Sequence, residues 1–475
     1  MKQVMLAVCI MIMLLGMIFP CHAQIADHDR IQPYAINPQY WQYKGQPVFL
    51  AGGSKTDHLF LIDGLQEHLD EMVEVGANYI RNTMSQRDRK ELKPHKLLPD
   101  GTFDMDQWND EYWQRFENML QWTAERDIFV QIEVWDRFDY ATNHWDISPW
   151  NPNNNVNYTA EESGFAEKYI STDLYRDKHP FFYTVPESPN YQKRLDMIRA
   201  HQERFVDKML SYSLSYGHVL YCMNNETSSP PEWGRYWIQS IQKKAAENGV
   251  IVYTTDMFDD LYMGDKSEHF QLMLDQPDLY TFIDISQVNS RNFDEKHWNQ
   301  MRWLVERIGK SARLRPANNT KIYGGGYSLW GSGGPDDGIQ RFWRDVLGGC
   351  ASVRHHRPSS GNGLEPIAKA CIRSFRMVES LVKMWDVEPH MELLLNRDSN
   401  EAYLAANPGE VYVLYLPRGG AVGVDLSACK GTLDVQWINA GAGETWKKRV
   451  VEGGAVRSFK TPMISQWIAI ITPQE

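Results

Sequence analysis

The sequence predicts a (β/α)8 barrel followed by a small all-β sandwich domain. Eight short apolar runs alternate with helix-like stretches. Beyond residue 388 the sequence pattern changes to short strands separated by Gly, Pro and Asn turns. The chain of 475 residues is long enough for a barrel of about 250 residues or more plus a second domain. We therefore assign 1–23 to a signal peptide, 24–388 to the barrel and 389–475 to the sandwich.

The first 23 residues resemble a secretory signal peptide in their pattern. Met1-Lys2 precedes an apolar run that extends through Phe19, and Cys21-His22-Ala23 ends on a small residue. The run is short for a membrane-spanning helix, and no later stretch is long and apolar enough to span a bilayer. We expect cleavage near Ala23 and export to the periplasm, the cell surface or the medium; an uncleaved membrane anchor is the alternative.

The strands expected for the barrel are 48–51, 79–83, 129–135, 219–223, 250–254, 282–286, 321–324 and 350–353. Helical periodicity fills the intervals, most clearly over 108–126, 191–214 and 365–385. So many strands alternating with helices favour a closed barrel over an open doubly wound sheet.

A long aromatic insertion, residues 137–189, follows the third strand. It contains Phe138, Tyr140, His144, Trp145 and Trp150. Structureless loops of this length in a compact domain are usually functional. Because aromatic faces stack on the apolar faces of sugars, we predict a substrate wall; the alternative is a lid that packs on the barrel without touching a ligand.

The last part of the chain carries short strands at hairpin spacing, expected at 402–405, 411–415, 422–426, 433–438, 457–459 and 467–471. The net charge of −12 argues against nucleic acid as a partner. Beyond the signal peptide lie Cys222, Cys350, Cys371 and Cys429, without metal-ligand spacing. We expect buried free thiols, with a disulfide as the alternative, and no metal or cofactor. The oligomeric state stays open.

Asn224-Asn225-Glu226 is the strongest candidate for a functional site. It ends a buried-looking strand, and a Ser/Pro cluster then opens a helix. A carboxylate in that place costs free energy to desolvate, and this end of a barrel strand is where catalytic groups lie.

Four segments, 40–53, 76–82, 224–226 and the β tail, follow one another as in the clan of barrel glycoside hydrolases that contains the cellulases and β-galactosidases. The chain resembles this clan, and most of all its apiosidase-like members, whose C-terminal β-sandwich carries a collagen-binding label. The resemblance implies that Glu226 is the acid/base that protonates the glycosidic oxygen. It also implies that Asn225 binds a substrate hydroxyl and that Arg81 orients the second carboxylate.

The seventh strand departs from that pattern. The clan places its nucleophilic Glu there, yet residues 319–330 contain no carboxylate. Glycoside hydrolysis normally needs two carboxylates, ~5 Å apart for retention and ~6.5–9.5 Å apart for inversion. We rank Asp256 and Asp136, at the ends of the fifth and third strands, first as the second carboxylate. A salt bridge with Arg137 is the alternative for Asp136.

The remaining substrate-binding candidates are Trp135, Trp145, Tyr327, Trp330, Arg354 and His355. The last two belong to Arg354-His-His-Arg357, which could bind an anionic sugar such as a uronate or a sulfate ester; the alternative is a loop that neutralises the acidic rim. The expected function is hydrolysis of a plant, algal or host polysaccharide. Its rivals are a non-catalytic glycan-binding barrel and an adhesion or matrix-binding protein acting through the β tail.

Overall fold

The computed structural model describes residues 27–474, apart from 86, 88–91, 175–177 and 289–291. The expected signal peptide, with its cleavage site near Ala23, lies outside these residues. Over the described part of the chain, no helix has both the length and the apolar character needed to cross a membrane.

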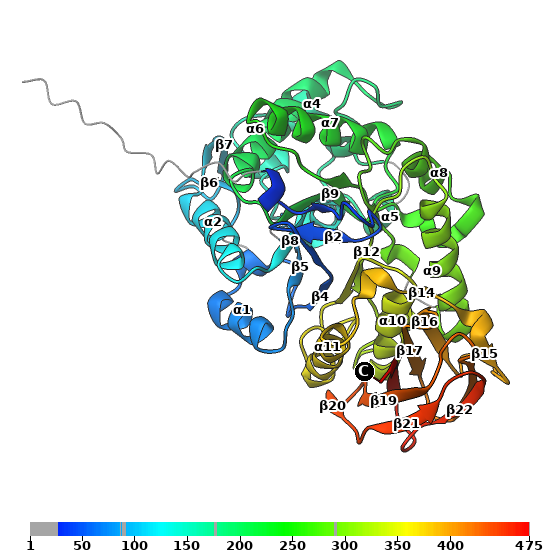
Figure 1. The fold of residues 1–475 in the computed structure, drawn as a ribbon. Helices are drawn as coiled ribbons and strands as arrows, with labels where there is room; N and C mark the ends of the chain where they lie inside the picture. Colours follow the sequence, from blue (N-terminus) through cyan, green and yellow to red (C-terminus); the bar gives the residue numbers. More distant parts are fainter. Residues whose placement is uncertain (1–26, 86, 88–91, 175–177, 289–291, 475) are drawn as a thin grey trace, which may run out of the picture.

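A parallel sheet of eight strands forms the first domain, in the order β10-β9-β8-β5-β4-β13-β12-β11 (Figure 1). The strands are β4 (Leu50–Gly53), β5 (Tyr79–Thr83), β8 (Phe129–Asp136), β9 (Val219–Asn225), β10 (Thr254–Thr255), β11 (Ile283–Asp284), β12 (Ala317–Ile322) and β13 (Ser352–His355). Between the outermost strands, the Thr281 amide donates to the Thr254 carbonyl at 2.8 Å. The sheet is thus nearly closed, which confirms the predicted (β/α)8 barrel.

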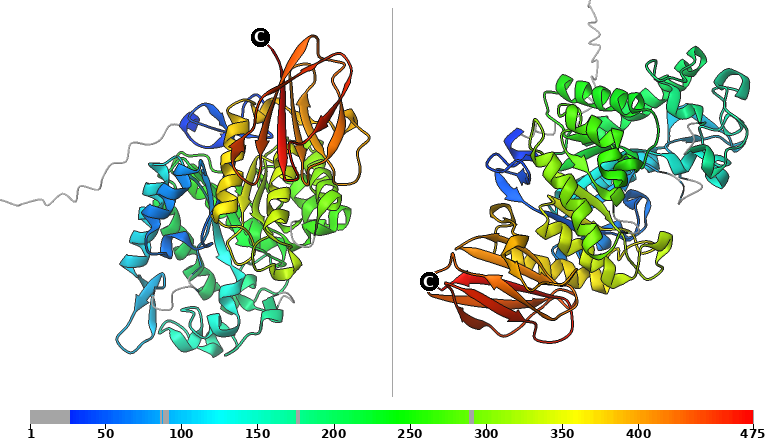
Figure 2. Two further views of the ribbon diagram at one scale, coloured as in Figure 1. Left: turned by 90° about the horizontal axis from the view of Figure 1, so that it is seen from below. Right: turned by 90° about the vertical axis from the view of Figure 1, so that its right-hand side faces the viewer.

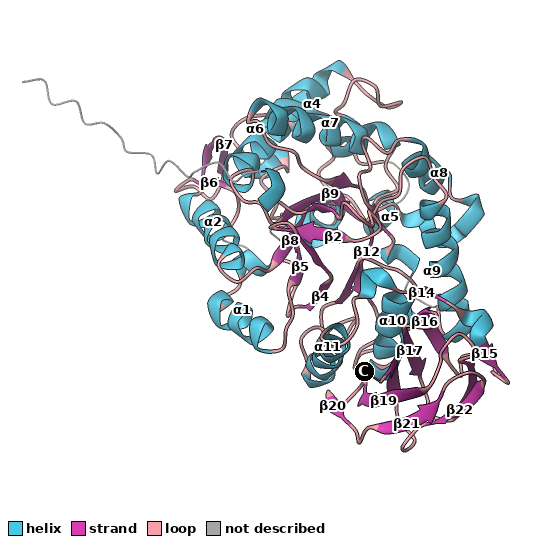
Figure 3. Cartoon of the chain, viewed as in Figure 1, coloured by secondary structure: helices cyan, strands magenta, loops and turns pink. Residues whose placement is uncertain are grey.

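Helices surround this sheet and follow its strands along the chain (Figure 3). They are α1 (Leu65–Glu74), α2 (Asp110–Ala124), α6 (Asp196–Ser213), α7 (Pro231–Glu247), α8 (Glu268–Asp275), α9 (Asp294–Gly309), α10 (Pro335–Leu347) and α11 (Pro366–Glu379). Pro occupies the first turn of α10, and the Asp337 carboxylate accepts a hydrogen bond from the Gly334 amide at 2.8 Å. Pro and an acidic side chain at this end favour helix initiation.

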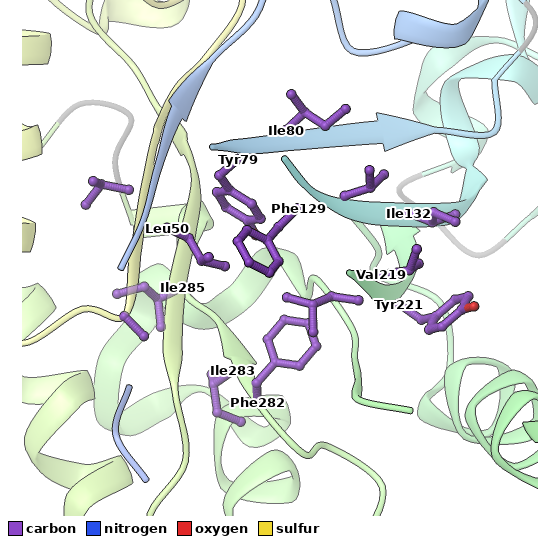
Figure 4. Close-up of a cluster of buried hydrophobic side chains, with 14 of the residues drawn as sticks. Leu50, Tyr79, Ile80, Phe129, Ile132, Val219, Tyr221, Phe282, Ile283 and Ile285 are labelled. Atoms are coloured by element: carbon purple, nitrogen blue, oxygen red, sulfur yellow. The ribbon is translucent and has the colours of Figure 1, made fainter. Parts of the chain in front are cut away.

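The barrel interior combines apolar packing with a chain of side-chain hydrogen bonds. Side chains that include Leu50, Tyr79 and Phe129 fill the space between the strands (Figure 4). The Tyr79 hydroxyl donates to Gln131 at 2.7 Å, and the Gln131 amide donates to Asp284 at 2.9 Å. Paired hydrogen bonds offset the free energy that burying these polar groups costs.

The seventh strand begins earlier than the expected 321–324. Residues 317–320 belong to β12 although several are polar, because each polar side chain has a buried partner. Asn318 accepts from the Trp41 indole at 2.9 Å, Asn319 donates to Asp345 at 2.6 Å, and Thr320 donates to Asp284 at 2.7 Å. An apolar pattern does not reveal a strand stabilised in this way.

The second domain is a sandwich of two antiparallel sheets, which confirms the predicted all-β architecture. One has the order β14-β16-β17-β23-β19-β20, with β21 on β19, and the other is β15-β18-β22. Their strands are β14 (Glu388–Pro389), β15 (Leu394–Leu395), β16 (Tyr403–Asn407), β17 (Val411–Leu416), β18 (Ala421–Asp425), β19 (Thr432–Asn439), β20 (Glu444–Thr445), β21 (Arg449–Glu452), β22 (Val456–Lys460) and β23 (Trp467–Pro473).

The sandwich packs on the barrel beside α10 and α11 (Figure 2). The rings of Trp343 and Tyr415 lie 6.0 Å apart across this contact, and the Ser374 hydroxyl donates to the Asn439 carbonyl at 2.9 Å. The described cysteines, Cys222, Cys350, Cys371 and Cys429, are buried free thiols, as expected.

A hairpin precedes the barrel and a compact insertion follows β8. The hairpin is β2 (Trp41–Tyr43) with β3 (Gln46–Val48), joined at its edge by β1 (Gln32–Pro33), and β6 (His95–Leu97) pairs with β7 (Phe103–Trp108) farther along. The insertion contains short helices: α3 (Thr142–Trp145), α4 (Ala160–Ser163) and α5 (Ser171–Leu174). Trp145 and Trp150 of this insertion are fully buried, and the Trp150 ring packs against His95 and Trp135 outside it.

Candidate active site

Glu226 follows β9 directly and lies at the C-terminal end of the barrel strands. Its backbone has φ of 61°, an uncommon conformation for a non-glycine residue that often marks functional sites. The loop is held by the Thr227 amide, which donates to the Met257 carbonyl at 2.9 Å. The side chain is 19% exposed, so part of it faces solvent.

A buried lysine contacts this carboxylate. Lys321, on β12, is 1% exposed, and its Nζ lies 2.6 Å from Glu226 Oε1 and 2.7 Å from Asn225 Oδ1. The seventh strand therefore supplies a cation to the site, on the strand where the resemblance expected a nucleophilic Glu. Sequence reasoning missed Lys321, although a lone Lys in a buried strand was a usable signal.

Arg137 joins Glu226 to a further carboxylate, that of Asp259. Arg137 Nη1 lies 2.5 Å from Asp259 Oδ2, and Nη2 lies 3.1 Å from Asp259 Oδ1 and 3.3 Å from Glu226 Oε2. Since one nitrogen contacts both, the two carboxylate oxygens are separated by no more than the sum of the last two distances, about 6.4 Å. The Asp259 side chain is 26% exposed, so both acidic residues are partly exposed.

The two carboxyl groups have pKa values shifted in opposite directions. Burial would raise the pKa of Glu226, but Lys321 and Arg137 outweigh it and hold that pKa well below its usual range. Burial raises the pKa of Asp259, and Arg137 opposes the change. Glu226 is therefore ionised at neutral pH, which fits a base or a nucleophile. It does not fit the proton-donor role implied by the resemblance.

Asp136, a predicted second carboxylate, is buried and already paired. It accepts a hydrogen bond from Asn225 Nδ2 at 3.0 Å, and Arg87 Nη1 lies 2.5 Å away. Burial raises its pKa, yet Arg87 and His58 outweigh this and lower it below the usual value. Asp136 thus orients Asn225 and pairs with Arg87, whereas Arg137 pairs with Glu226 and Asp259.

Asp256, the other predicted second carboxylate, has no exposed surface. It accepts hydrogen bonds from Asn224 Nδ2 at 2.9 Å and from the Met257 amide at 2.8 Å. Helix α7 lies directly against it, since a Cβ added to Gly234 would be 2.1 Å from its Oδ2. Burial raises the pKa of Asp256 to about 7. The catalytic prediction for Asp256 is corrected to a buried structural role, because its strand end turns the carboxylate under a helix.

Arg81 makes a buried ion-pair network. Its Nε donates to Glu133 Oε1 at 2.8 Å, and its Nη1 lies 3.0 Å from Asp57 Oδ1. Burial lowers the pKa of Arg81, but the two carboxylates outweigh it and raise that pKa above its usual value. The carboxylates that Arg81 contacts are thus Glu133 and Asp57. Because it is fully buried, it offers no surface to a substrate.

Arg354 and His355 are likewise fully buried. Arg354 Nη1 donates to the Thr320 carbonyl at 3.0 Å, and the His355 ring stacks on Phe342 with centroids 5.1 Å apart. Their predicted contact with an anionic sugar is therefore corrected: both belong to the packing of β13, where side chains face the barrel core or the surrounding helices.

Trp135 and Trp145 belong to the core rather than to a substrate wall. The Trp135 ring lies 5.2 Å from that of Trp237 on α7, although Glu133, two residues earlier, points into the barrel toward Arg81. Simple alternation would place both side chains on one face, but the end of β8 departs from it. Trp145 is 0% exposed and its ring contacts Phe165 at 5.5 Å.

Exposed aromatic residues do occur in the loop between β12 and α10. Tyr327 is 73% exposed and Trp330 is 51% exposed. The Trp330 ring lies 6.0 Å from that of Tyr323, which in turn lies 4.9 Å from the His356 ring. Both side chains are exposed, and their role as substrate contacts stays a prediction.

Two solved structures similar to this chain are glycoside hydrolases. A glycoside hydrolase family 5 protein from Bacteroides vulgatus superposes with a TM-score of 0.63 and 11% identity over 93% of each chain. A second structure, described as a glycoside hydrolase, gives 0.62 and 10% over 94% of this chain and 97% of the other. No family profile and no curated protein sequence matches. At such identities the likeness establishes the fold.

Proposed function

We propose that the protein is an exported glycoside hydrolase in which Glu226 and Asp259 are the two catalytic carboxyl groups. The observation that carries this proposal is their convergence on Arg137, which keeps the two acids within about 6.4 Å of each other at the barrel mouth. Neighbouring acids whose environments push their pKa values apart are suited to opposite roles in acid–base catalysis.

In the proposed reaction, Asp259 protonates the glycosidic oxygen as the bond to the anomeric carbon breaks. Ionised Glu226 either attacks that carbon or takes a proton from the attacking water. Lys321 and Arg137 stabilise Glu226 as an anion, and Asn225, held by Asp136, presents its amide to a substrate hydroxyl. A protonated Asp259 carries no negative charge to attract the Arg137 guanidinium. Arg137 is then paired with the ionised Glu226 alone.

A second candidate, a glycan-binding barrel without hydrolysis, is favoured by Lys321. Its ammonium lies 2.6 Å from Glu226 and could hold this carboxylate permanently as a hydrogen-bond acceptor for sugar hydroxyls. The two candidates differ in whether a bond is cut, so one experiment separates them.

The experiment measures sugar release from a panel of plant, algal and host glycans. Wild type is compared with Glu226→Gln, Asp259→Asn and the control Asp260→Asn, whose carboxylate faces His269 instead. Because acid–base catalysis contributes roughly 10²–10⁴-fold, the first two variants should lose at least about a hundredfold in rate, and the control should stay close to wild type.

Each outcome decides between the candidates. Release by wild type that both variants lose supports the hydrolase, and the anomer of the product then shows retention or inversion. Binding without release by any of the proteins supports the glycan-binding barrel. Release that Asp259→Asn leaves unchanged refutes the assignment of Asp259.

A further inference from the structure

Cations outnumber carboxylates around Asp57, which lies between β4 and α1 near the ends of the barrel strands. Its oxygens lie 3.0 Å from Arg81, 3.4 Å from Arg354, 3.4 Å from Arg357 and 3.6 Å from His356. Burial raises the pKa of Asp57, but these groups together lower it well below the usual value. Asp57 thus faces three buried or half-buried guanidinium groups, whereas burial lowers the pKa of His356 well below its usual value.

Of these guanidinium groups, Arg357 has the fewest contacts with carboxylates and hydrogen-bond acceptors. Arg81 also binds Glu133, and Arg354 also donates to the Thr320 carbonyl. Over the described part of the chain, Arg357 has its contact of 3.4 Å with Asp57, and its Nε has no hydrogen-bond partner. Its side chain is 28% exposed, so part of it faces solvent, whereas the unpartnered Nε is itself buried.

Arg357 and Glu226 both act electrostatically on one residue, Tyr323. Tyr323 connects them: its ring lies 4.9 Å from that of His356, the residue before Arg357. Burial raises the pKa of the Tyr323 hydroxyl, the charge of Glu226 raises it further, and Arg357 lowers it. The phenol is therefore within electrostatic reach of both the catalytic carboxylate and the guanidinium.

We propose that Arg357 binds the carboxylate or sulfate of an anionic sugar unit, so that the substrate is a uronate- or sulfate-bearing glycan. This inference rests on the proposed function, because it names the substrate class of that site. A guanidinium presents a planar set of donors that matches the oxygens of a carboxylate or sulfate, and such charge-assisted bonds are among the strongest in proteins. A neutral sugar would leave the excess of positive charge uncompensated.

The test measures binding to the Glu226→Gln protein, which separates recognition from turnover. The probes are an oligogalacturonide, a sulfated galactan oligosaccharide and a neutral cello-oligosaccharide of equal length, titrated by calorimetry. We expect at least one anionic probe to bind roughly tenfold or more tightly than the neutral one, since hydrogen bonds to charged groups are each worth about a tenfold or greater change in affinity.

Adding Arg357→Met should remove that preference and leave the neutral probe unchanged. Arg357→Lys keeps the charge and should retain part of the preference, and it also serves if the Met variant fails to fold. Arg313→Met, which removes an exposed arginine paired with Asp278, is the matched control and should change nothing. Higher salt should weaken anionic binding in proteins that retain Arg357.

The proposal fails if the neutral probe binds as tightly as the anionic probes, if none of the three binds, or if Arg357→Met keeps the anionic preference. If the Met variant does not fold, an Arg357→Lys protein that keeps the full preference is the equivalent failure. Failure of the proposed function is a different result: wild type would bind an anionic probe without cleaving it. Preference for the uronate or for the sulfate probe identifies which anion is bound.

Discussion

Replacing Lys321 and Glu226 singly and together tests whether this ion pair is a buried, strongly coupled contact. The variants are Lys321→Met, which keeps the unbranched chain and removes the charge, Glu226→Gln, and the double variant. Either single change leaves one charge without its nearest partner, whereas the double change removes both charges. The stability that the pair contributes therefore appears as the coupling energy of the cycle.

The geometry sets the expected size. At the Nζ–Oε1 distance of 2.6 Å and an effective dielectric constant of about 20, the gross attraction is roughly 6 kcal/mol. Desolvation offsets part of it, and breaking a buried pair by removing one partner typically costs about 3–5 kcal/mol. With Arg137 still contacting Oε2, we expect a coupling energy of about 3 kcal/mol, well above the ~0.2–1 kcal/mol of exposed pairs.

Urea unfolding followed by tryptophan fluorescence measures each corner of the cycle. The pKa of Glu226 is depressed in the folded protein, so its stabilisation is complete above the unfolded pKa of about 4.3 and is lost as pH falls through the folded value. The coupling should thus be equal at pH 6 and pH 8. It should also survive 1 M NaCl, because Lys321 is inaccessible to solvent.

A coupling energy below about 1 kcal/mol at pH 7 would refute the reasoning, since that is the range of exposed pairs. A coupling that disappears in 1 M NaCl would contradict it as well. Arg313→Met with its partner substitution Asp278→Asn provides the matched exposed pair, for which we expect a coupling near zero.

Two further predictions concern buried groups. Burial raises the pKa of Asp345 to about 8, so its contribution to stability decreases as pH rises from the unfolded value of about 3.9 toward 8. Between pH 5 and pH 8, the free energy of unfolding of wild type should fall by roughly 4 kcal/mol more than that of Asp345→Asn in urea unfolding, and parallel pH profiles would contradict this. Trp135→Ala should cost about 3–5 kcal/mol by leaving a cavity against α6 and α7, whereas the exposed control Trp330→Ala should cost less than about 1 kcal/mol. Equal losses in the two tryptophan variants would show that Trp135 is not part of the core.

Much of the fold was predictable because it depends on local patterns. Strand and helix periodicity predicts the barrel and the sandwich, and β5 occurs at the predicted residues 79–83. Strand ends were less predictable in two cases. In β12 the strand is formed by polar side chains, and in β10 only two residues, Thr254–Thr255, pair with a neighbouring strand. In both cases the deciding contacts come from other strands.

The sequence by itself determined that Glu226 ends the fourth strand of a barrel, at the end of the strands where such folds bind ligands. It could not show which groups surround it. Lys321, Arg137 and Asp259 come from separate segments and meet Glu226 only when the sheet curves into a barrel. The direction of each side chain at a strand end, and therefore the ionisation of the carboxylate, follows from register, twist and burial, which exist only in the tertiary structure.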